Sequence, residues 1–413
     1  MFSNSTKKKA PVFTKKDKKT KKIIIPNLYP EFSEVNKVIG AKLGYNLITV
    51  PAADEEAVEL GKKYVHNDIC FPAQLNTGEI LAGLKARESD RANLAVALSK
   101  RCNACRALQY FVLVRKALDE SGFEDIPVVT NGTDLDGIHP GFKLGIQYNI
   151  YALQGMLYLD TLFEMRQRIV AYEINKGETE KAFRHYLDKG LTAFAKGFSP
   201  MLKVLKEAVN AFNNIKHDTK NKKPIVGIVG EILVNYHPTA NYNLTNYLLE
   251  NGMEPWLPPI LDFFRQEVVN MDEAARHKFS SFPLLDRISS YLLGEVFNYY
   301  IRKVEKIKKN FIYYYPKPDI HELSQNVEGI MEQAFNSGEG WLLPGEIVAM
   351  IKKGVKSFVI VQPFGCLPNH ISGRGMIKAI KEKFSNIQIL SLDYDPDISI
   401  GNIENRLQML IMT

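Results

Sequence analysis

The sequence predicts an α/β protein with two doubly wound parallel-sheet domains and an additional helical segment. Short apolar runs alternate with longer helical patterns over residues 23–149 and again over residues 223–413, which is the rhythm of βαβ units. Between these regions, residues 150–222 have apolar residues at helical spacing and no strand-like run. A length of 413 residues suits two domains better than one.

In the first α/β region, helical patterns follow the apolar runs. The helix expected over residues 30–44 ends on a glycine, and the helix over residues 53–65 has acidic residues in its first turn. A third helix is expected from about residue 105 to residue 121. The expected strands are KIIIPNL (22–28), YNLITVP (45–51), ANLAVALS (92–99) and DIPVVTN (125–131).

The polar stretch HDTKNKKP, residues 217–224, marks the expected boundary between the helical segment and the second α/β domain. The strands expected in this domain are PIVGIVGEIL (224–233), KSFVIVQPFGC (356–366) and NIQILSLDYD (386–395). The expected helices are NYNLTNYLLENG (241–252), LDRISSYLLGEVFNYYIRKVEKI (285–307), GMIKAIKEKF (375–384) and IENRLQMLIM (403–412).

The positive charge is concentrated at the N-terminus. Residues 1–22 hold nine Lys and one Asp, a net of +8, whereas the whole chain has a net charge of +7, so the remainder is nearly neutral (7 − 8 = −1). We expect residues 1–22 to form a disordered Lys-rich tail, because they contain few apolar residues. A solvated tail is favoured over a contact with nucleic acid or an acidic partner, since no other basic patch accompanies it.

Neither a signal peptide nor a membrane span is expected. The N-terminal stretch lacks an apolar h-region, and no run approaches the ~18 apolar residues of a span. We therefore expect a cytoplasmic protein with reduced thiols, which disfavours a structural disulfide.

The four cysteines, Cys70, Cys102, Cys105 and Cys366, are the candidate metal and cofactor ligands. Each is expected at the carboxyl end of a strand or at the start of a helix, where parallel sheets bind ligands and helix dipoles favour thiolates. One C-x-x-C pair with two distant single cysteines favours an interdomain [4Fe–4S] cluster over zinc, because zinc sites usually use two close pairs. A thiol redox pair, or buried inert cysteines, would explain the same residues without a metal.

Four segments of the chain are distinctive: HNDICFPAQLNTGEILAGLK, RCNACRALQYFVLVRKAL, GEGWLLPGEIVAMIKKGVKSFVIVQPFGCLPNHISGRGMIKAIKEKF and ILSLDYDPDISIGNIENRLQMLI. They closely resemble the C-terminal module of 2-hydroxyacyl-CoA dehydratase activase-like proteins of anaerobic bacteria. That module is similar to subunits of 2-hydroxyacyl-CoA dehydratases and benzoyl-CoA reductases, and to double-cubane cluster proteins. The resemblance covers nearly the whole chain from Ile23 onward, and QPFGCLPNH with GRGMIK is its most specific part.

The resemblance implies an oxygen-sensitive cluster between two α/β domains, held by cysteines of the Cys70, Cys102/Cys105 and Cys366 type. It also implies a separate ATP-dependent activase that delivers electrons, an acyl-CoA-type or other small substrate, and a dimer. The chain has no fused ATPase domain with a G-x-x-x-x-G-K-[ST] loop. It has four cysteines, whereas characterised dehydratases use three per cluster and a double cubane needs six. A fourth thiolate would close the cluster.

Glu231 and His370 are weaker candidates for catalysis. Glu231 follows the apolar run IVGIVG, where a carboxylate suits either acid–base chemistry or a helix N-cap. His370 lies four residues after Cys366 and could donate to a cluster sulfide or a substrate, but a structural hydrogen bond is favoured for it and for Asn369. Arg101 and Arg106 flank the thiol pair, and they either offset cluster charge or belong to an ordinary exposed helix end.

Several polar and aromatic positions are expected to be structural. The acidic stretch DYDPD, residues 393–397, is better explained as an Asp-Pro turn than as a Mg²⁺ site. Trp256 and Trp341 are expected to be packing residues.

The sequence thus predicts an iron–sulfur protein that takes low-potential electrons from an activase for reductive or radical chemistry on a small substrate. Two further functions fit the same residues: a non-catalytic electron carrier or regulatory partner with a closed [4Fe–4S] cluster, and a zinc-stabilised binding protein. No motif identifies the substrate.

Overall fold

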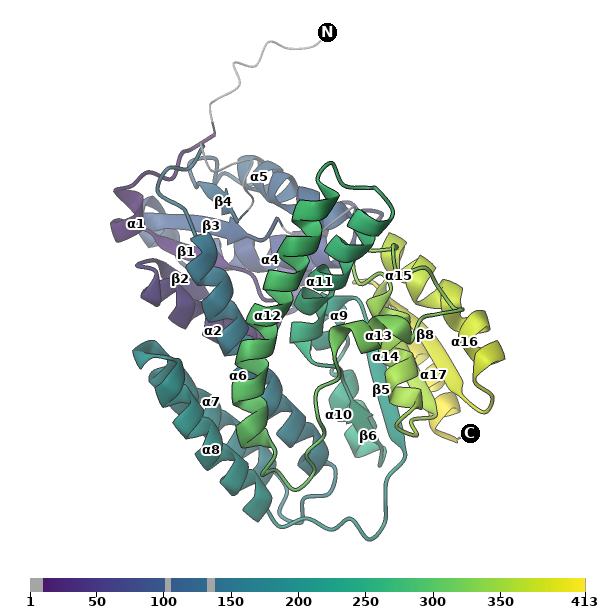
Figure 1. The fold of residues 1–413 in the computed structure, drawn as a ribbon. Helices are drawn as coiled ribbons and strands as arrows, with labels where there is room; N and C mark the ends of the chain where they lie inside the picture. Colours follow the sequence, from purple (N-terminus) through teal and green to yellow (C-terminus); the bar gives the residue numbers. More distant parts are fainter. Residues whose placement is uncertain (1–9, 101–104, 132–137, 413) are drawn as a thin grey trace.

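The computed structural model describes residues 10–100, 105–131 and 138–412, and it confirms the predicted fold class. Two four-stranded parallel sheets lie in different parts of the molecule, with helices around them (Figure 1). The strands of the first sheet are β1 (Lys22–Ile25), β2 (Asn46–Thr49), β3 (Leu94–Leu98) and β4 (Val128–Thr130). Those of the second are β5 (Ile225–Gly230), β6 (Glu254–Trp256), β7 (Ser357–Pro363) and β8 (Gln388–Tyr394).

The two sheets have the same topology. The strand orders are β2-β1-β3-β4 and β6-β5-β7-β8, so in each sheet the first strand lies between the second and the third. The direction of winding reverses beside that first strand, and such switch points are where open parallel sheets bind ligands. The switch points therefore lie at the carboxyl ends of β1 and β3 in one sheet and of β5 and β7 in the other.

Helix α4 joins the first sheet to the second half of the chain. It packs very closely on its neighbour α3, because the residues at the contact, Gly61 and Gly78, have no side chains. A Cβ at Gly78 would lie 1.8 Å from the carbonyl oxygen of Ala57. At its start, Phe71 and Leu75 are part of a core cluster that contains residues of the second sheet and its helices. The helices of this half are α2 (Pro30–Lys42), α3 (Glu55–Tyr64), α4 (Phe71–Lys85) and α5 (Tyr110–Glu120).

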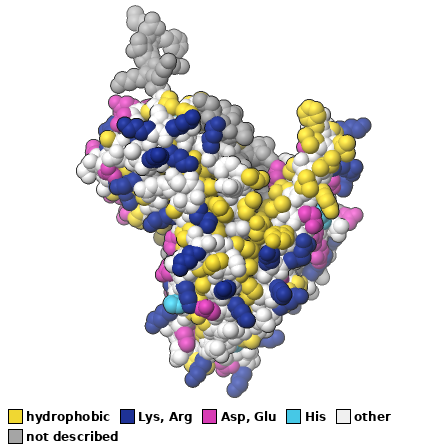
Figure 2. All heavy atoms as spheres, turned by 60° about the vertical axis from the view of Figure 1, so that its left-hand side comes forward, with side chains coloured by type: hydrophobic (Ala, Val, Ile, Leu, Met, Phe, Trp, Pro, Cys, Tyr) yellow, Lys and Arg dark blue, Asp and Glu magenta, His cyan; other side chains and the backbone are white. Residues whose placement is uncertain are grey.

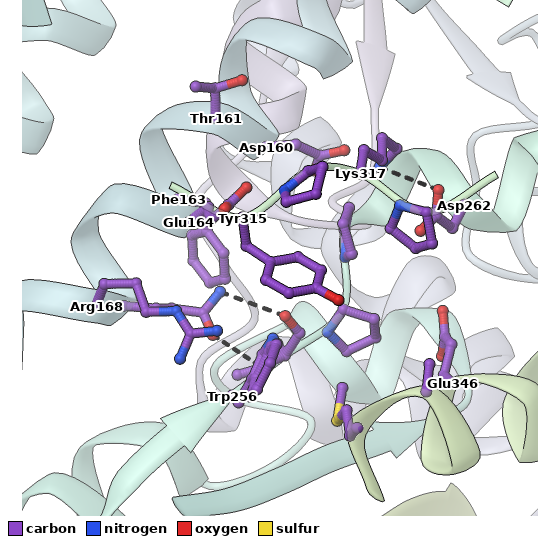
Figure 3. A pocket seen from close by; sticks show the side chains of 18 of the residues that line it. Asp160, Thr161, Phe163, Glu164, Arg168, Trp256, Asp262, Tyr315, Lys317 and Glu346 are labelled. Atoms are coloured by element: carbon purple, nitrogen blue, oxygen red, sulfur yellow. Dashed lines mark hydrogen bonds and ion pairs between the residues drawn. The ribbon is translucent and has the colours of Figure 1, made fainter. Parts of the chain in front are cut away.

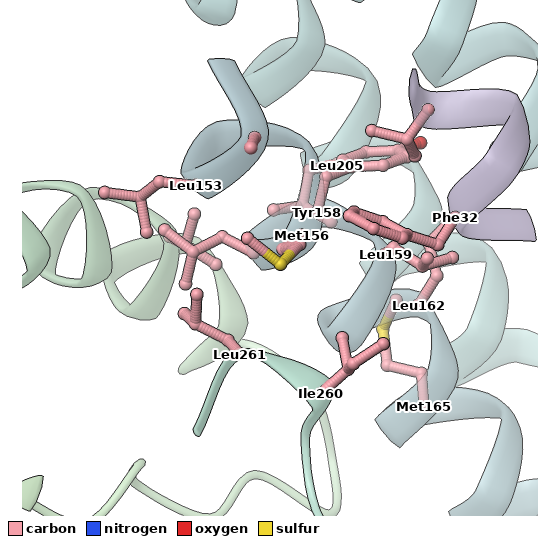
Figure 4. Close-up of a cluster of buried hydrophobic side chains, with 14 of the residues drawn as sticks. Phe32, Leu153, Met156, Tyr158, Leu159, Leu162, Met165, Leu205, Ile260 and Leu261 are labelled. Atoms are coloured by element: carbon pink, nitrogen blue, oxygen red, sulfur yellow. The ribbon is translucent and has the colours of Figure 1, made fainter. Parts of the chain in front are cut away.

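The helical segment is larger than predicted. Its first helix begins at Gly145, and α11 and α12 from the second half of the chain pack against it together with α2. These helices share the largest core cluster, in which Phe32 of α2, Met156 of α6 and Ile260 of α11 meet (Figure 4). The helices are α6 (Gly145–Val170), α7 (Glu178–Lys196), α8 (Phe198–Asn214), α11 (Ile260–Arg276) and α12 (Pro283–Lys308).

The second sheet is surrounded by shorter helices. Strand β6 and helices α9, α11, α13 and α14 were not predicted, and the remaining strands of both sheets lie within the predicted segments. The helices of this part are α9 (Ile232–Tyr236), α10 (Leu244–Glu250), α13 (Ile320–Gln325), α14 (Leu342–Ile351), α15 (Leu367–Ser372), α16 (Ile377–Lys383) and α17 (Ile400–Met412).

The expectation of a disordered tail over residues 1–22 is wrong for residues 10–22. This stretch contains the short helix α1 (Asp17–Thr20) and the first residue of β1. The Phe13 ring is fully buried edge-on against Phe142, and its backbone N–H donates to Nδ1 of His139 at 3.1 Å. Phe13 therefore anchors this Lys-rich stretch on the first sheet, together with Lys21, which donates to the carbonyl oxygen of Ala92, while residues 1–9 lie outside the described part of the chain.

The first half of α12 and the loop before it expose an apolar surface, which we call the α12 face. Large hydrophobic side chains gather on this projecting part of the molecule (Figure 2). They recur every three or four positions, so one side of the helix is apolar and open to solvent. The α12 face consists of Phe279, Phe282, Leu284, Leu285, Ile288, Tyr291, Leu292, Val296 and Tyr299, each between 41% and 75% exposed. Among the described residues, no helix is long and apolar enough to cross a membrane.

Candidate functional site

Three of the predicted cysteines lie at helix starts, as the sequence indicated. Cys70 is the N-cap residue of α4, and Cys366 is the N-cap residue of α15, three residues after β7 ends. Cys105 precedes the 3-10 helix η2 (Arg106–Gln109), where its Sγ accepts the Ala107 N–H at 3.3 Å. Cys102 and Arg101 lie outside the residues that the structure describes.

Cys70 is close enough to both Cys105 and Cys366 for an electrostatic influence. The pKa of Cys70 is raised to about 12. Burial is the main cause, and the charges of Glu231 and Cys105 contribute to the increase. Burial is also the main cause that raises the pKa of Cys366. The charges of Glu339 and Cys70 raise it as well. The first half of the chain and the segment after β7 therefore bring their thiols to one region, between the two switch points.

Two side chains tie the Cys70 and Cys105 segments together. The guanidinium of Arg106 donates to the carbonyl oxygen of Ile69 at 2.7 Å and to that of Asp68. The hydroxyl of Tyr110 is hydrogen-bonded to the Cys70 thiol and lowers its pKa against the effect of burial. Arg106 is exposed, as an ordinary helix end would be, but it also fixes the distance between two thiol-bearing loops.

A pair of carboxyl groups lies beside the thiols. Glu231 directly follows β5 and accepts the Val234 N–H at 2.9 Å, so the predicted N-cap role is confirmed. Burial raises its pKa to about 8, helped by the nearby charge of Glu339. Burial likewise raises the pKa of Glu339, which accepts the Ile232 N–H at 2.9 Å and the Asn369 side-chain N–H at 2.7 Å. At neutral pH, the pair thus favours at least one protonated carboxyl group beside the thiols.

No protein-family model matches the chain, and no curated protein matches it.

His370 and Asn369 have structural contacts. The Nδ1 atom of His370 is 2.8 Å from the carbonyl oxygen of Cys366, which supports the predicted backbone bond. Asn369 is fully buried, and its bond to Glu339 links the start of α15 to the carboxyl pair. Both residues therefore hold the Cys366 turn in place.

Glu79 and Glu339 are two buried acids that sequence reasoning missed. Glu79 is 1% exposed on α4 and accepts hydrogen bonds from the backbone of Asn27 and Ala53 and from Nε2 of His237. Glu79 could have been found from the sequence, because it is the one acidic residue in the apolar stretch GEILAGL. A carboxylate buried in such a helix needs hydrogen-bond donors around it. Glu339 lies in the loop before α14 and offered no comparable pattern.

The remaining predicted positions are structural. The carboxylate of Asp395 accepts the Asp397 N–H at 2.8 Å, which is the expected Asp-Pro turn. Trp341 is fully buried and donates to Asn270 at 3.0 Å. Trp256 stacks under the guanidinium of Arg168, 3.9 Å from its ring centre.

The described thiols do not form a site for a single metal ion, and a cluster has different requirements. Among the residues that the structure describes, no group of three or more His, Cys, Asp and Glu side chains is close enough to hold one metal ion. The thiols of a four-iron cluster bind different iron atoms and need not converge on one point, as zinc ligands must. Three thiols at three helix starts, with backbone N–H groups nearby, suit such an anionic group.

Proposed function

We propose that this chain is a cytoplasmic iron–sulfur protein related to the 2-hydroxyacyl-CoA dehydratase and benzoyl-CoA reductase subunits. Cys70, Cys102, Cys105 and Cys366 would hold one [4Fe–4S] cluster between the two sheets. A separate ATP-dependent activase would supply low-potential electrons. The cluster, when bound, supplies one-electron chemistry for an acyl-CoA-type or other small substrate.

The observation that supports this proposal is that Cys70 lies near both Cys105 and Cys366. These residues come from distant parts of the sequence, yet Cys105 raises the pKa of Cys70, and Cys70 raises that of Cys366. Packing alone does not require three cysteines at three separate helix starts beside two sheet switch points. A shared ligand at the switch points would account for this arrangement.

The chain's own residues suit proton transfer beside such a centre. Glu231 has a pKa of about 8, so its carboxyl group carries a proton at neutral pH and can donate it. The backbone N–H of Val234 holds Oε2 in place. Burial of Cys70 and Cys366, each 8% exposed, limits the access of water.

A role as an electron carrier is favoured by the number of thiols. Four cysteines are available, and four thiolates would leave no iron open to a substrate. In that case, the chain would pass electrons to a partner, and Glu231 would serve only as the cap of α9.

We further propose that a second copy of the chain covers the α12 face. Nine large apolar side chains are open to solvent there, and monomeric proteins seldom expose patches beyond a few hundred Å². Side chains of this kind bury about 150–250 Å² each when aromatic, so the α12 face can supply the ~800 Å² per partner of a typical stable interface.

Anaerobic purification followed by iron, sulfide and zinc analysis tests the cluster. About four irons and four sulfides per chain are expected, together with a reducible signal in electron paramagnetic resonance. Stoichiometric zinc without sulfide, or a protein without any metal, would overturn the proposal.

Single Cys→Ser variants test whether the site is shared. Cys366→Ser is expected to reduce iron content and change the spectrum as strongly as Cys105→Ser, although the residues are far apart in sequence. Unchanged spectra in Cys366→Ser would show that this thiol is not a ligand. A cluster whose iron responds to added acyl-CoA supports the enzyme, and a cluster that does not respond supports the carrier.

A further inference from the structure

A solvent-connected pocket lies between the helical segment and the second sheet, beside the carboxyl end of β6 (Figure 3). Its walls come from α6, the residues after β6, the end of α12, the segment 315–318 and α14. The space into which the centre of a water-sized sphere fits is about 100 Å³, so the pocket suits a small, slender ligand. Cys70, Cys105 and Cys366 are not among the residues that line it.

Most charges in the pocket wall are neutralised by neighbours. The pairs are Arg168 with Glu254 at 2.9 Å, Lys308 with Glu164 at 2.9 Å and Glu305 at 2.8 Å, and Lys317 with Asp262 at 3.0 Å. Asp160 is also occupied, because its carboxylate accepts the N–H groups of Ile260 and Leu261 at the start of α11. These contacts explain why charged side chains tolerate burial here.

Lys353 differs from the other cations of the wall. It has no carboxylate partner among the described residues, and its Nζ lies 3.5 Å from the ring centre of Tyr315 and 5.2 Å from that of Trp256. The guanidinium of Arg168 stacks on the same Trp256 ring. Burial and the charge of Arg168 lower the pKa of Lys353 to about 8. This end of the pocket therefore has a positive charge that Glu164 and Asp262 offset only from a distance.

Glu346 is at the other end of the pocket. Figure 3 shows its carboxyl group pointing into the space, on the side of Asp262 and away from Arg168 and Trp256. No hydrogen bond or ion pair joins it to any residue that the structure describes. Burial and the charges of Asp262 and Glu339 raise its pKa. These effects favour the protonated carboxyl group, which can donate a hydrogen bond.

The spacing of these two residues sets the shape of a ligand. Glu346 lies on α14 and Lys353 lies seven positions later, just beyond its end. Seven residues make about two helical turns, or roughly 10 Å, and both side chains line the pocket. Ala349 lines the pocket between them, and its small side chain leaves room for an apolar chain.

We propose that this pocket binds an elongated monocarboxylate with a neutral hydrogen-bond acceptor, a hydroxyl or carbonyl group, at its far end. The carboxylate pairs with Lys353, the apolar body lies over Ala349, and the carboxyl group of Glu346 donates to the acceptor. One anionic group suffices, because the other cations of the wall already have partners.

Isothermal titration calorimetry with ligands of graded length tests the proposal. The probes are 4-hydroxybutanoate, 6-hydroxyhexanoate and 8-hydroxyoctanoate, each compared with the unsubstituted acid of equal length. One hydroxy acid is expected to bind at least threefold more tightly than its unsubstituted counterpart. If no probe binds at millimolar concentration, the proposal is overturned.

Variants assign the two ends of the ligand. Lys353→Met is expected to weaken binding of the best probe at least tenfold. Glu346→Leu is expected to abolish the preference for the hydroxyl group. Glu346→Gln is expected to restore this preference in part. The matched controls are the exposed Lys356→Met and Glu332→Gln, which are expected to bind normally. Equal affinity in Lys353→Met and wild type overturns the assignment. The cluster plays no part in this test, so its result is independent of the proposed function.

Discussion

Glu79 on α4 and His237 after α9 are 158 residues apart in sequence and share a buried hydrogen bond of 2.9 Å. The same carboxylate accepts the backbone N–H groups of Asn27 and Ala53, at 2.7 and 2.9 Å. One side chain thus connects the switch point of the first sheet with the helix that follows β5. This connection keeps Cys70, at the start of α4, beside Glu231, at the start of α9.

Replacement of Glu79 is expected to destabilise the whole protein. Glu79→Ala leaves several buried donors without an acceptor, so the free energy of unfolding should fall by about 3–5 kcal/mol. Urea denaturation of the metal-free protein measures this change. The exposed Glu59→Ala on α3 serves as control and should change stability by less than about 0.5 kcal/mol. A similar loss in both variants would contradict the role of Glu79.

A methyl group at position 78 is expected to force α3 and α4 apart. The new Cβ of Gly78→Ala would lie 1.8 Å from the carbonyl oxygen of Ala57, a backbone atom that cannot rotate away. Such overpacking costs about 1–3 kcal/mol or more, measured as the shift of the urea midpoint. Gly294→Ala is the matched control: its Cβ would have no neighbour closer than 3.6 Å, and the helix should gain up to about 1 kcal/mol.

The Cys70 thiol of the metal-free protein is expected to react slowly with iodoacetamide. Its pKa of about 12 leaves roughly one molecule in 10,000 as thiolate at pH 8, far fewer than for a free cysteine. We expect alkylation at least a hundredfold slower in the native protein than in urea, followed by mass spectrometry of the Cys70 peptide. Equal rates in both conditions would show that Cys70 is not buried as described.

The stability of the protein is expected to depend on the ionisation of Glu231. Its pKa is about 8 in the folded state and near its usual value of 4.5 in the unfolded chain, so the unfolded state ionises first as pH rises. Wild-type stability should therefore fall between about pH 4.5 and pH 8, by the order of a few kcal/mol. Glu231→Gln keeps the cap of α9 without ionising.

Urea denaturation at a series of pH values compares these proteins. The stability of Glu231→Gln relative to wild type should increase steadily with pH over this range. The exposed Glu382→Gln should follow wild type throughout. Parallel pH profiles for wild type and Glu231→Gln would show that the folded-state pKa of Glu231 is ordinary.

A charge on the α12 face is expected to prevent dimerisation. Ile288 is 49% exposed near the centre of the face, and burying a glutamate there without a partner is costly. Sedimentation velocity should show a dimer for wild type and a monomer for Ile288→Glu, with the dissociation constant raised at least a hundredfold. The exposed Lys378→Glu on α16 should remain dimeric. A monomeric wild type would contradict the proposed interface.

Local sequence patterns predicted most of the sheets. Strands buried on both faces need continuous apolar runs, and β5 and β7 are such runs. Strand β6 has only three residues with Pro255 in the middle, so it has no such run; it lies at the edge of its sheet, where a proline is tolerated. The order of residues 10–22 depends on Phe13 and its distant partner His139, which composition cannot reveal.

The cysteine positions were predictable because prolines mark helix starts. Pro72 and Pro368 lie in the first turns of the helices that Cys70 and Cys366 cap. The carboxyl groups around the thiols were not fully predictable. Glu339 is defined by contacts with Ile232 and Asn369, which are remote in sequence, and a single sequence contains no record of such contacts.

The separation of the thiols along the chain has a consequence for biosynthesis. Cys366 leaves the ribosome 261 residues after Cys105, which at about 5–20 residues per second is a delay of roughly 13–50 s. During that interval the early thiols have no counterpart from the second sheet. A complete ligand set for the proposed site therefore exists only after Cys366 has been synthesised and both halves have docked.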